Sequence, residues 1–179
     1  LATKTVADCR PWLQVQQDHV RLPNDVEITD FYRIVMPEYA MIFATTASQE
    51  VVLVEHYKHG PALVSLELPA GYIEADESDP LLTAKRELLE ETGYQSENWR
   101  PLGQFFIDGN RGCGRVHAFL ATDVQHVQEP QHENTELLVL KTIPVAELQT
   151  FWEQGQLPNI TVTAIVGLAL HHLKQSELL

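Results

Sequence analysis

Hydrophobic and polar residues alternate in the first part of the chain in the way that half-buried β-strands require. Between Val26 and Val35, apolar residues stand at nearly every second position. The turn signal Pro23-Asn24-Asp25 separates this run from a looser mixture of apolar and polar residues at Trp12–Leu22. We therefore predict a hairpin here, and more broadly a small antiparallel β appendage over residues 1–36.

Pro37 ends this pattern, and the residues after it predict the main domain, over residues 37–179. Runs rich in β-branched and aromatic residues predict the strands of this domain. These runs are Tyr39–Thr45, Val51–Tyr57, Leu63–Leu68, Leu102–Ile107, Arg115–Thr122 and Leu137–Ile143.

A change of pattern after the third of these strands predicts a helix. Asp79-Pro80 is typical of a helix start, Leu81–Thr92 is rich in helix formers, and Gly93 stands where a C-cap belongs. Two further helices are predicted, from Pro144 to Trp152 and from Ile160 to Leu173. This order of elements predicts an α+β fold, with mixed β-sheets sandwiched by helices, rather than repeated strand–helix–strand units.

The charge balance narrows the ligands that such a domain can bind. The 179 residues include 25 Asp and Glu but only 12 Lys and Arg, which gives a net charge of −13. A chain this acidic is a poor partner for nucleic acid or for an anionic membrane surface, since both attract basic proteins. If the ligand carries phosphate, a cation must bridge the two negative partners.

The two cysteines, Cys9 and Cys113, are far apart in the sequence and have neither metal-site spacing nor a disulfide framework. The chain shows no export signal, and its longest apolar stretch, Ile160–Leu170, is too short to span a bilayer. We therefore expect two reduced thiols and a cytoplasmic location.

Three carboxylates gather on the predicted helix at Leu81–Thr92. Glu87 and Glu91 are four residues apart and share a helix face, and Glu90 lies beside them. Like charges at this spacing repel one another, and a hard cation such as Mg²⁺ would turn the repulsion into binding. Arg86 is four residues before Glu90 and can hold it in place, while Glu77 precedes the helix and can fold back on the cluster. The plainer alternative is a solvated acidic helix face.

The string Gly71–Tyr94 resembles the Nudix box, whose pattern is G-x5-E-x7-R-E-U-x-E-E-x-G-U with U an aliphatic or aromatic residue. Gly71, Glu77 and the run from Arg86 to Tyr94 match that pattern. One departure is that eight residues, Ser78–Lys85, stand where the pattern has seven. The extra residue falls before the R-E-x-x-E-E register and leaves it intact.

The preceding string, Glu67-Leu68-Pro69-Ala70-Gly71, resembles the entry to the box in the ADP-ribose and ADP-sugar pyrophosphatase branch of that family. The resemblance implies a Nudix fold and a metal-dependent attack of water on a pyrophosphate, with Mg²⁺ as the cofactor and Mn²⁺ as a substitute. It implies a homodimer formed partly through the N-terminal strands. The implied metal ligands are the Ala70 carbonyl, Glu87 and Glu91, with Glu90 and Glu77 in support.

The same resemblance suggests the remaining roles. The general base comes from the late acidic loop Glu129–Glu136, with Glu133 favoured and Glu136 second, and Glu90 and Arg86 complete the catalytic set. The candidate substrate-binding residues are Lys58, Arg111 and Gly71. We expect a nucleoside diphosphate sugar such as ADP-ribose to give a nucleoside monophosphate and a sugar phosphate. The alternatives are another pyrophosphate (GDP-mannose, a dinucleoside polyphosphate or a nucleoside triphosphate) and a catalytically silent nucleotide-sugar sensor.

Overall fold

The computed structural model of the chain describes residues 1–74, 76–131 and 138–177. Within these ranges the strands are β1 (Ala2–Cys9), β2 (Leu13–Arg21), β3 (Glu27–Val35), β4 (Tyr39–Thr45), β5 (Glu50–Lys58), β6 (Leu63–Glu67), β7 (Ala70–Tyr72), β8 (Tyr94–Gln95), β9 (Asn98–Asp108), β10 (Gly112–Thr122), β11 (Gln125–His126) and β12 (Leu138–Pro144). The helices are α1 (Pro80–Thr92), α2 (Val145–Glu153) and α3 (Ile160–Glu177).

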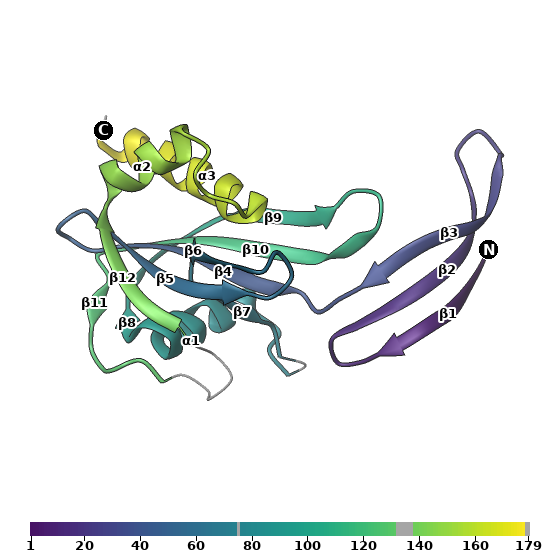
Figure 1. Cartoon of the computed structure of the whole chain (residues 1–179), viewed down its shortest axis with the longest axis horizontal. Helices are drawn as coiled ribbons and strands as arrows, with labels where there is room; N and C mark the ends of the chain where they lie inside the picture. Colours follow the sequence, from purple (N-terminus) through teal and green to yellow (C-terminus); the bar gives the residue numbers. More distant parts are fainter. Residues whose placement is uncertain (75, 132–137, 178–179) are drawn as a thin grey trace.

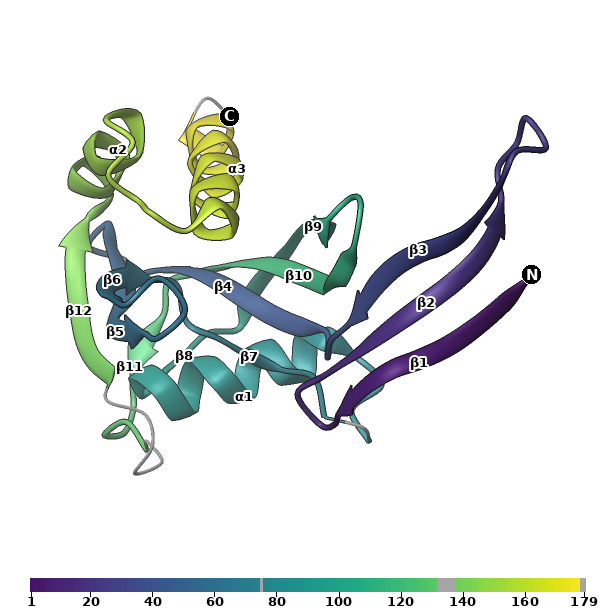
Figure 2. The same cartoon turned by 45° about the vertical axis from the view of Figure 1, so that its right-hand side comes forward.

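A mixed sheet forms the centre of the molecule, in the order β1-β2-β3-β10-β4-β5-β12, with β6, β7 and β9 pairing on β5, β4 and β10. Helix α1 covers one face of the sheet, while α2 and α3 cover the other (Figures 1 and 2). β4 and β10 run parallel to each other, and β12, β6 and β9 are antiparallel to their partners. The α+β arrangement predicted from the sequence is therefore present.

The two helical layers explain why β4 is apolar from Ala40 to Ala44. Met41 and Phe43 belong to the core between the sheet and α3, whereas Ala40 and Ile42 belong to the core that includes Leu88 of α1. A strand that is covered on both faces buries successive side chains on opposite sides. The resulting rigidity matters for function, because β4 supports β7 and through it the residues of the site.

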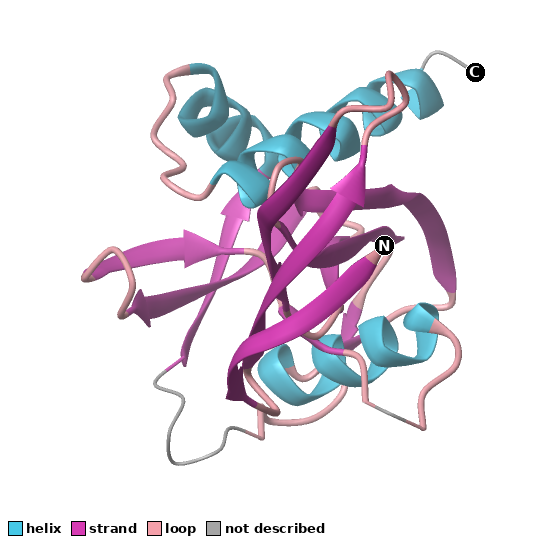
Figure 3. Ribbon diagram, turned by 90° about the vertical axis from the view of Figure 1, so that its right-hand side faces the viewer, coloured by secondary structure: helices cyan, strands magenta, loops and turns pink. Residues whose placement is uncertain are grey.

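The first three strands form an antiparallel sheet that extends away from the helical layers (Figures 1 and 2) and that faces the viewer in Figure 3. Its attachment to the rest of the sheet is narrow, with Ile34 pairing with Gly112 at the start of β10. Inside this sheet, the carboxylate of Asp18 is almost fully buried and accepts hydrogen bonds from Arg33 and from the Thr3 hydroxyl. The hairpin predicted from the sequence corresponds to β2 and β3.

Several elements differ from the sequence-based prediction. The sequence pattern does not predict β1 as a separate strand, because its side chains are nearly all exposed and show little apolar periodicity. The strands β7, β8 and β11 have only two or three residues each, too few for a periodic pattern. Helix α3 continues to Glu177, beyond the predicted end at Leu173. None of the helices in the described ranges has the length and hydrophobicity needed to cross a bilayer.

Candidate functional site

Local sequence fixes both ends of α1, the helix that carries the acidic cluster. The Asp79 side chain accepts a hydrogen bond from the Leu81 N–H at 3.0 Å, and Pro80 stands in the first turn. At the other end Gly93 adopts φ 74°, and its N–H donates to the Leu89 carbonyl. Leu88 packs into the core, so the helix cannot rotate and the positions of the carboxylates are set.

These carboxylates line a cleft of about 670 Å³, which we call the site cleft. Its acidic lining residues include Glu87, Glu90 and Glu91 of α1. Its apolar and aromatic lining residues include Met36, Pro37, Tyr39, Tyr72 and Ile107. The lining also includes His56, Lys58, Glu67 and Asn159. A cleft of this size is typical of small-molecule sites, which span about 300–1,000 Å³.

Glu87 packs directly against the backbone of β7. A Cβ atom placed on Gly71 would lie only 1.9–2.3 Å from the carbon and oxygens of the Glu87 carboxyl group. Any other residue at position 71 would therefore displace this carboxylate. The glycine of the motif is needed for a close approach between the strand and the helix.

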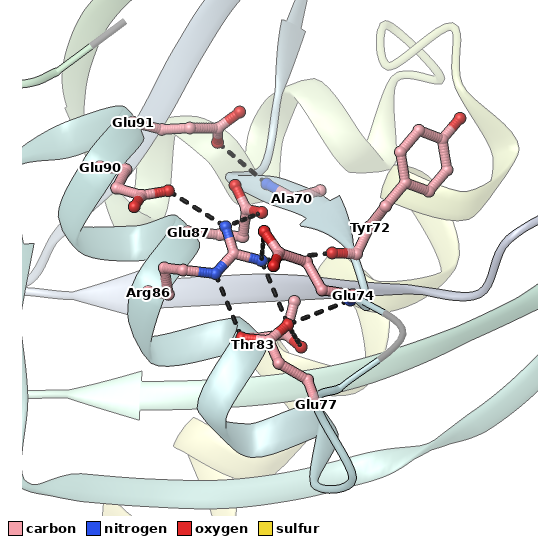
Figure 4. Close-up of polar contacts among 9 residues, drawn as sticks. All are labelled: Ala70, Tyr72, Glu74, Glu77, Thr83, Arg86, Glu87, Glu90 and Glu91. Atoms are coloured by element: carbon pink, nitrogen blue, oxygen red, sulfur yellow. Dashed lines mark hydrogen bonds and ion pairs between the residues drawn. The ribbon is translucent and has the colours of Figure 1, made fainter. Parts of the chain in front are cut away.

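Glu91 reaches the same strand from the next turn of the helix (Figure 4). Its Oε2 atom accepts a hydrogen bond from the Ala70 backbone N–H at 3.0 Å. Ala70 is itself held by antiparallel pairing with Met41 of β4. The carboxylates of Glu87 and Glu91 thus lie against two adjacent residues of β7, Gly71 and Ala70.

Arg86 is at the centre of the polar contacts in Figure 4. Its Nη1 donates to Glu87 Oε1 at 2.7 Å and to Glu90 Oε2 at 3.1 Å, and its Nε donates to Glu77 Oε1 at 3.2 Å. Its Nη2 also donates to the Tyr72 carbonyl at 3.3 Å, so the guanidinium joins α1 to β7. These contacts raise the pKa of Arg86 further above its ordinary value, and the side chain stays charged. The predicted pairing of Arg86 with Glu90 is present.

Glu77 reaches the cluster although one extra residue separates it from Arg86. Its carboxylate accepts hydrogen bonds from Arg86 and, at 2.7 Å, from the Thr83 hydroxyl. These bonds, first the one from Arg86, lower the pKa of Glu77 from 4.5 to about 2. Glu77 is therefore ionised at neutral pH and directed at Arg86.

The residues around Ala70 suit a divalent cation of the hard type. In the described part of the chain, no three His, Cys, Asp or Glu side chains are grouped closely enough to hold a metal by themselves. Mg²⁺ does not require such a group, because it typically takes one or two carboxylates and fills the other positions with water and substrate phosphate. Glu87, Glu91 and the Ala70 carbonyl offer oxygen donors only, and the absence of a Cβ at Gly71 lets a carboxylate approach the backbone. The donor chemistry fits the metal that the sequence predicts.

The predicted substrate-binding residues differ in where they lie. Lys58 and Gly71 line the site cleft. Arg111 is not among its lining residues, since it stands in the turn between β9 and β10, where its Nη1 is 3.7 Å from the Asp108 carboxylate. Arg111 therefore lies outside the lining of this cleft, and its assignment as a substrate-binding residue stays a prediction.

The predicted general bases Glu133 and Glu136 lie outside the described residues. Gln131 lines the site cleft and donates its backbone N–H to the Glu90 carbonyl at 2.7 Å, and Leu138 pairs with His56 of β5.

The sequence assigns no role to several other polar residues of the cleft, among them His56, Glu67 and Asn159. The Nδ1 atom of His56 is 2.9 Å from Lys58 Nζ, and Glu67 is hydrogen-bonded to Asn159 at 3.0 Å. The alternation of β5 could have indicated His56, which shares a strand face with Lys58. Nothing local links Glu67 to Asn159, which are 92 residues apart in the sequence.

Comparison with known proteins finds a matching family and a matching fold. The NUDIX domain model matches residues 36–161. An ADP-ribose pyrophosphatase of Mycobacterium tuberculosis (strain ATCC 25618 / H37Rv) is 30% identical over 161 residues, 88% of this chain and 75% of that protein. A methanol dehydrogenase activator of Bacillus methanolicus is 36% identical over 110 residues, 61% of this chain and 58% of that protein.

A solved structure described as an ADP compounds hydrolase superposes with a TM-score of 0.84 at 21% identity. The superposition covers 98% of this chain and 94% of that one, so it includes the N-terminal strands. At this identity the match concerns the fold alone, and it confirms the α+β fold predicted from the sequence.

Proposed function

Because this chain belongs to the NUDIX family, we propose that it is a metal-dependent pyrophosphohydrolase that cleaves the diphosphate of a nucleoside diphosphate sugar. The proposed substrate is ADP-ribose or a related ADP-sugar, and the products are AMP and a sugar phosphate. The similarity to the mycobacterial ADP-ribose pyrophosphatase, over most of both chains, supports this substrate class.

The observation that carries the proposal is the position of Glu87 and Glu91 against β7 in a cleft that also contains Lys58. A net charge of −13 makes direct binding of a diphosphate unfavourable unless cations intervene. We assign Glu87, Glu91 and the Ala70 carbonyl as the ligands of Mg²⁺, with Mn²⁺ as a substitute. When bound, such a cation neutralises phosphate charge and makes water a better nucleophile.

The other residues of the cluster keep these ligands in place. Arg86 holds Glu87 and Glu90 through its Nη1 atom, and Glu77 in turn holds the guanidinium. Gly71 leaves the space that the Glu87 carboxylate occupies. Lys58, which also lines the cleft, offers an ammonium group to a phosphate, as a point charge rather than a bidentate fork. Together these residues orient the diphosphate without forming a covalent bond to it.

We assign the proton-accepting role to Glu133, with Glu136 as the second candidate. If Glu133 removes a proton from the attacking water, Glu133→Gln lowers kcat by roughly 10²–10⁴-fold. The measurement is steady-state hydrolysis of ADP-ribose, with Glu136→Gln assayed in parallel. An unchanged rate for Glu133→Gln together with a large loss for Glu136→Gln would move the role to Glu136.

A panel of substrates, assayed with and without Mg²⁺, tests the proposed reaction. It includes ADP-ribose, another ADP-sugar, GDP-mannose, a dinucleoside polyphosphate and a nucleoside triphosphate. The proposal predicts AMP and ribose 5-phosphate from ADP-ribose in Mg²⁺ and none after chelation. Faster turnover of GDP-mannose or of a polyphosphate would favour the other pyrophosphatase activities, and binding without turnover in Mg²⁺ or Mn²⁺ would favour a sensor.

Two further proposals complete this assignment. The three N-terminal strands form part of a homodimer interface, and the enzyme works in the cytoplasm. The first is supported by the exposed apolar side chains of this sheet, including Val6, Tyr32 and Val35. The second is consistent with Cys9 and Cys113, which are not joined in a disulfide.

A further inference from the structure

A second hollow, which we call the side hollow, lies next to the site cleft and has a volume of about 570 Å³. The two share Lys58, Glu67 and Asn159 as lining residues. The rim of the side hollow is exposed at His59, Gly60 and Pro61, whereas Ser65 and Glu67 are buried. It is therefore open to solvent at the rim and has buried polar groups beneath.

The Glu67 carboxylate is the most unusual of these groups. The residue is only 3% exposed, and no Lys, Arg or His in the described part of the chain forms an ion pair with it. Its contacts are with neutral donors, the Ser65 hydroxyl and the Asn159 amide, whose Nδ2 is 3.0 Å from Glu67 Oε2. An ionised carboxylate has about four acceptor sites, so these two bonds leave capacity for further donors.

Asn159, which directly precedes α3, helps to fix the orientation of the Glu67 carboxylate. The Oδ1 atom of Asn159 accepts the Thr161 N–H at 2.9 Å at the start of α3, and its amide group therefore presents Nδ2 to Glu67. Ser65 is two residues away on the same face of β6 and holds the other oxygen. A carboxylate held in this way is a preorganised acceptor for hydroxyl groups.

We propose that the side hollow binds the sugar half of the substrate, with Glu67 accepting hydrogen bonds from sugar hydroxyls. This inference rests on the proposed function. Lys58 stands on the shared wall, where it meets the phosphate attached to that sugar. The nucleoside half then contacts apolar and aromatic lining residues of the site cleft that the side hollow does not share, such as Met36, Tyr72 and Ile107, because a planar base binds best among such groups.

Binding of the two products tests the inference without any turnover. The Kd values of ribose 5-phosphate and of AMP are measured by calorimetry in Mg²⁺ for the wild-type chain and for Glu67→Gln. In Glu67→Gln the sugar hydroxyls lose hydrogen bonds to a charged acceptor, so the Kd of ribose 5-phosphate should rise by about 10-fold or more. The Kd of AMP should change by less than about 2-fold. Glu55→Gln is the matched control, since Glu55 is half-exposed on the opposite face of β5 and should leave both Kd values unchanged.

Asn159→Ser provides a second test if Glu67→Gln does not fold. Serine keeps a side-chain oxygen that can cap α3 but lacks the amide that orients Glu67. This variant should therefore also weaken the binding of ribose 5-phosphate and leave the binding of AMP unchanged. The melting temperature of each variant separates this effect from general destabilisation. An unchanged Kd for ribose 5-phosphate, or an equal loss for AMP, overturns the inference. Because no hydrolysis is measured, this failure is distinct from a failure to cleave ADP-ribose.

Discussion

Gly71 shows at the level of one residue how the site depends on close contact between strand and helix. The space that its missing Cβ would take is filled by the Glu87 carboxyl group, at 1.9–2.3 Å. That group is the far end of a flexible side chain, and it can move without disturbing the core. A methyl group at position 71 should therefore affect the chemistry more than the fold.

We predict that Gly71→Ala lowers kcat for ADP-ribose by on the order of 10²-fold, because a shift of about 1 Å in a catalytic group has effects of this size. Its melting temperature should fall by only a few degrees. Gly109→Ala is the matched control, since no atom lies within 4 Å of the Cβ it would add. Near-normal activity of Gly71→Ala would show that the position of Glu87 does not matter for turnover.

Spacing along the chain alone predicts only contacts between residues that are close in sequence, whereas the contact of Ala70 with Glu91, 21 residues apart, is implied by the family resemblance. Glu87 and Glu91 are four residues apart on one helix, and helix geometry alone places them on one face. The contact of Arg86 with Glu90 follows from the same spacing. Glu67 and Asn159 meet only because α3 begins beside β6, and this depends on the packing of the whole chain. A local sequence pattern therefore cannot predict this tertiary contact.

At the scale of elements, the fold was predictable wherever an element is long enough to bury a regular set of side chains. The strands β4 and β5 are buried along most of their length, and α1 has recognisable signals at both ends. The three residues of β7 give no such signal, although they support the site. The position of β7 follows from its pairing with β4, a tertiary contact.

The N-terminal sheet contains an ion pair between the buried Asp18 and the half-exposed Arg33, and this pair makes the stability of the sheet depend on pH. Hydrogen bonds from Arg33 and Thr3 hold the pKa of Asp18 below its ordinary value in the folded chain. The stabilisation is therefore present above the unfolded pKa, about 3.9, and is lost as pH falls through the lowered folded value.

We expect Asp18→Asn to reduce the free energy of unfolding by about 1–3 kcal/mol at pH 7, because the donors of Arg33 and Thr3 lose a charged acceptor. The difference from wild type should shrink as the pH is lowered from about 4. Chemical denaturation across this pH range measures both effects, and Asp30→Asn, at an exposed position of β3, is the control. A difference that stays constant down to pH 2 would contradict the assignment.

At the scale of the whole molecule, the N-terminal sheet extends from a body to which it is joined narrowly, through the pairing of Ile34 with Gly112 (Figure 1). The division into residues 1–36 and 37–179 stays a prediction, as does the homodimer. Exposed apolar side chains on an open sheet favour association with another chain.

Sedimentation of the full-length chain tests the predicted dimer. We expect a species of twice 20.3 kDa at micromolar concentration, because association would cover the exposed apolar side chains of the sheet. A single species of 20.3 kDa over the whole concentration range would contradict this prediction.

The central claim is that a divalent cation held by Glu87, Glu91 and Ala70 drives cleavage of the diphosphate. Hydrolysis of ADP-ribose in Mg²⁺ by wild type and by Glu91→Gln tests it most directly, with Glu97→Gln, at an exposed position beyond α1, as the control. We predict AMP and ribose 5-phosphate from wild type and from Glu97→Gln, and a loss of about 10³-fold or more in Glu91→Gln, whose fold persists. Near-normal, Mg²⁺-dependent hydrolysis by Glu91→Gln would contradict the account.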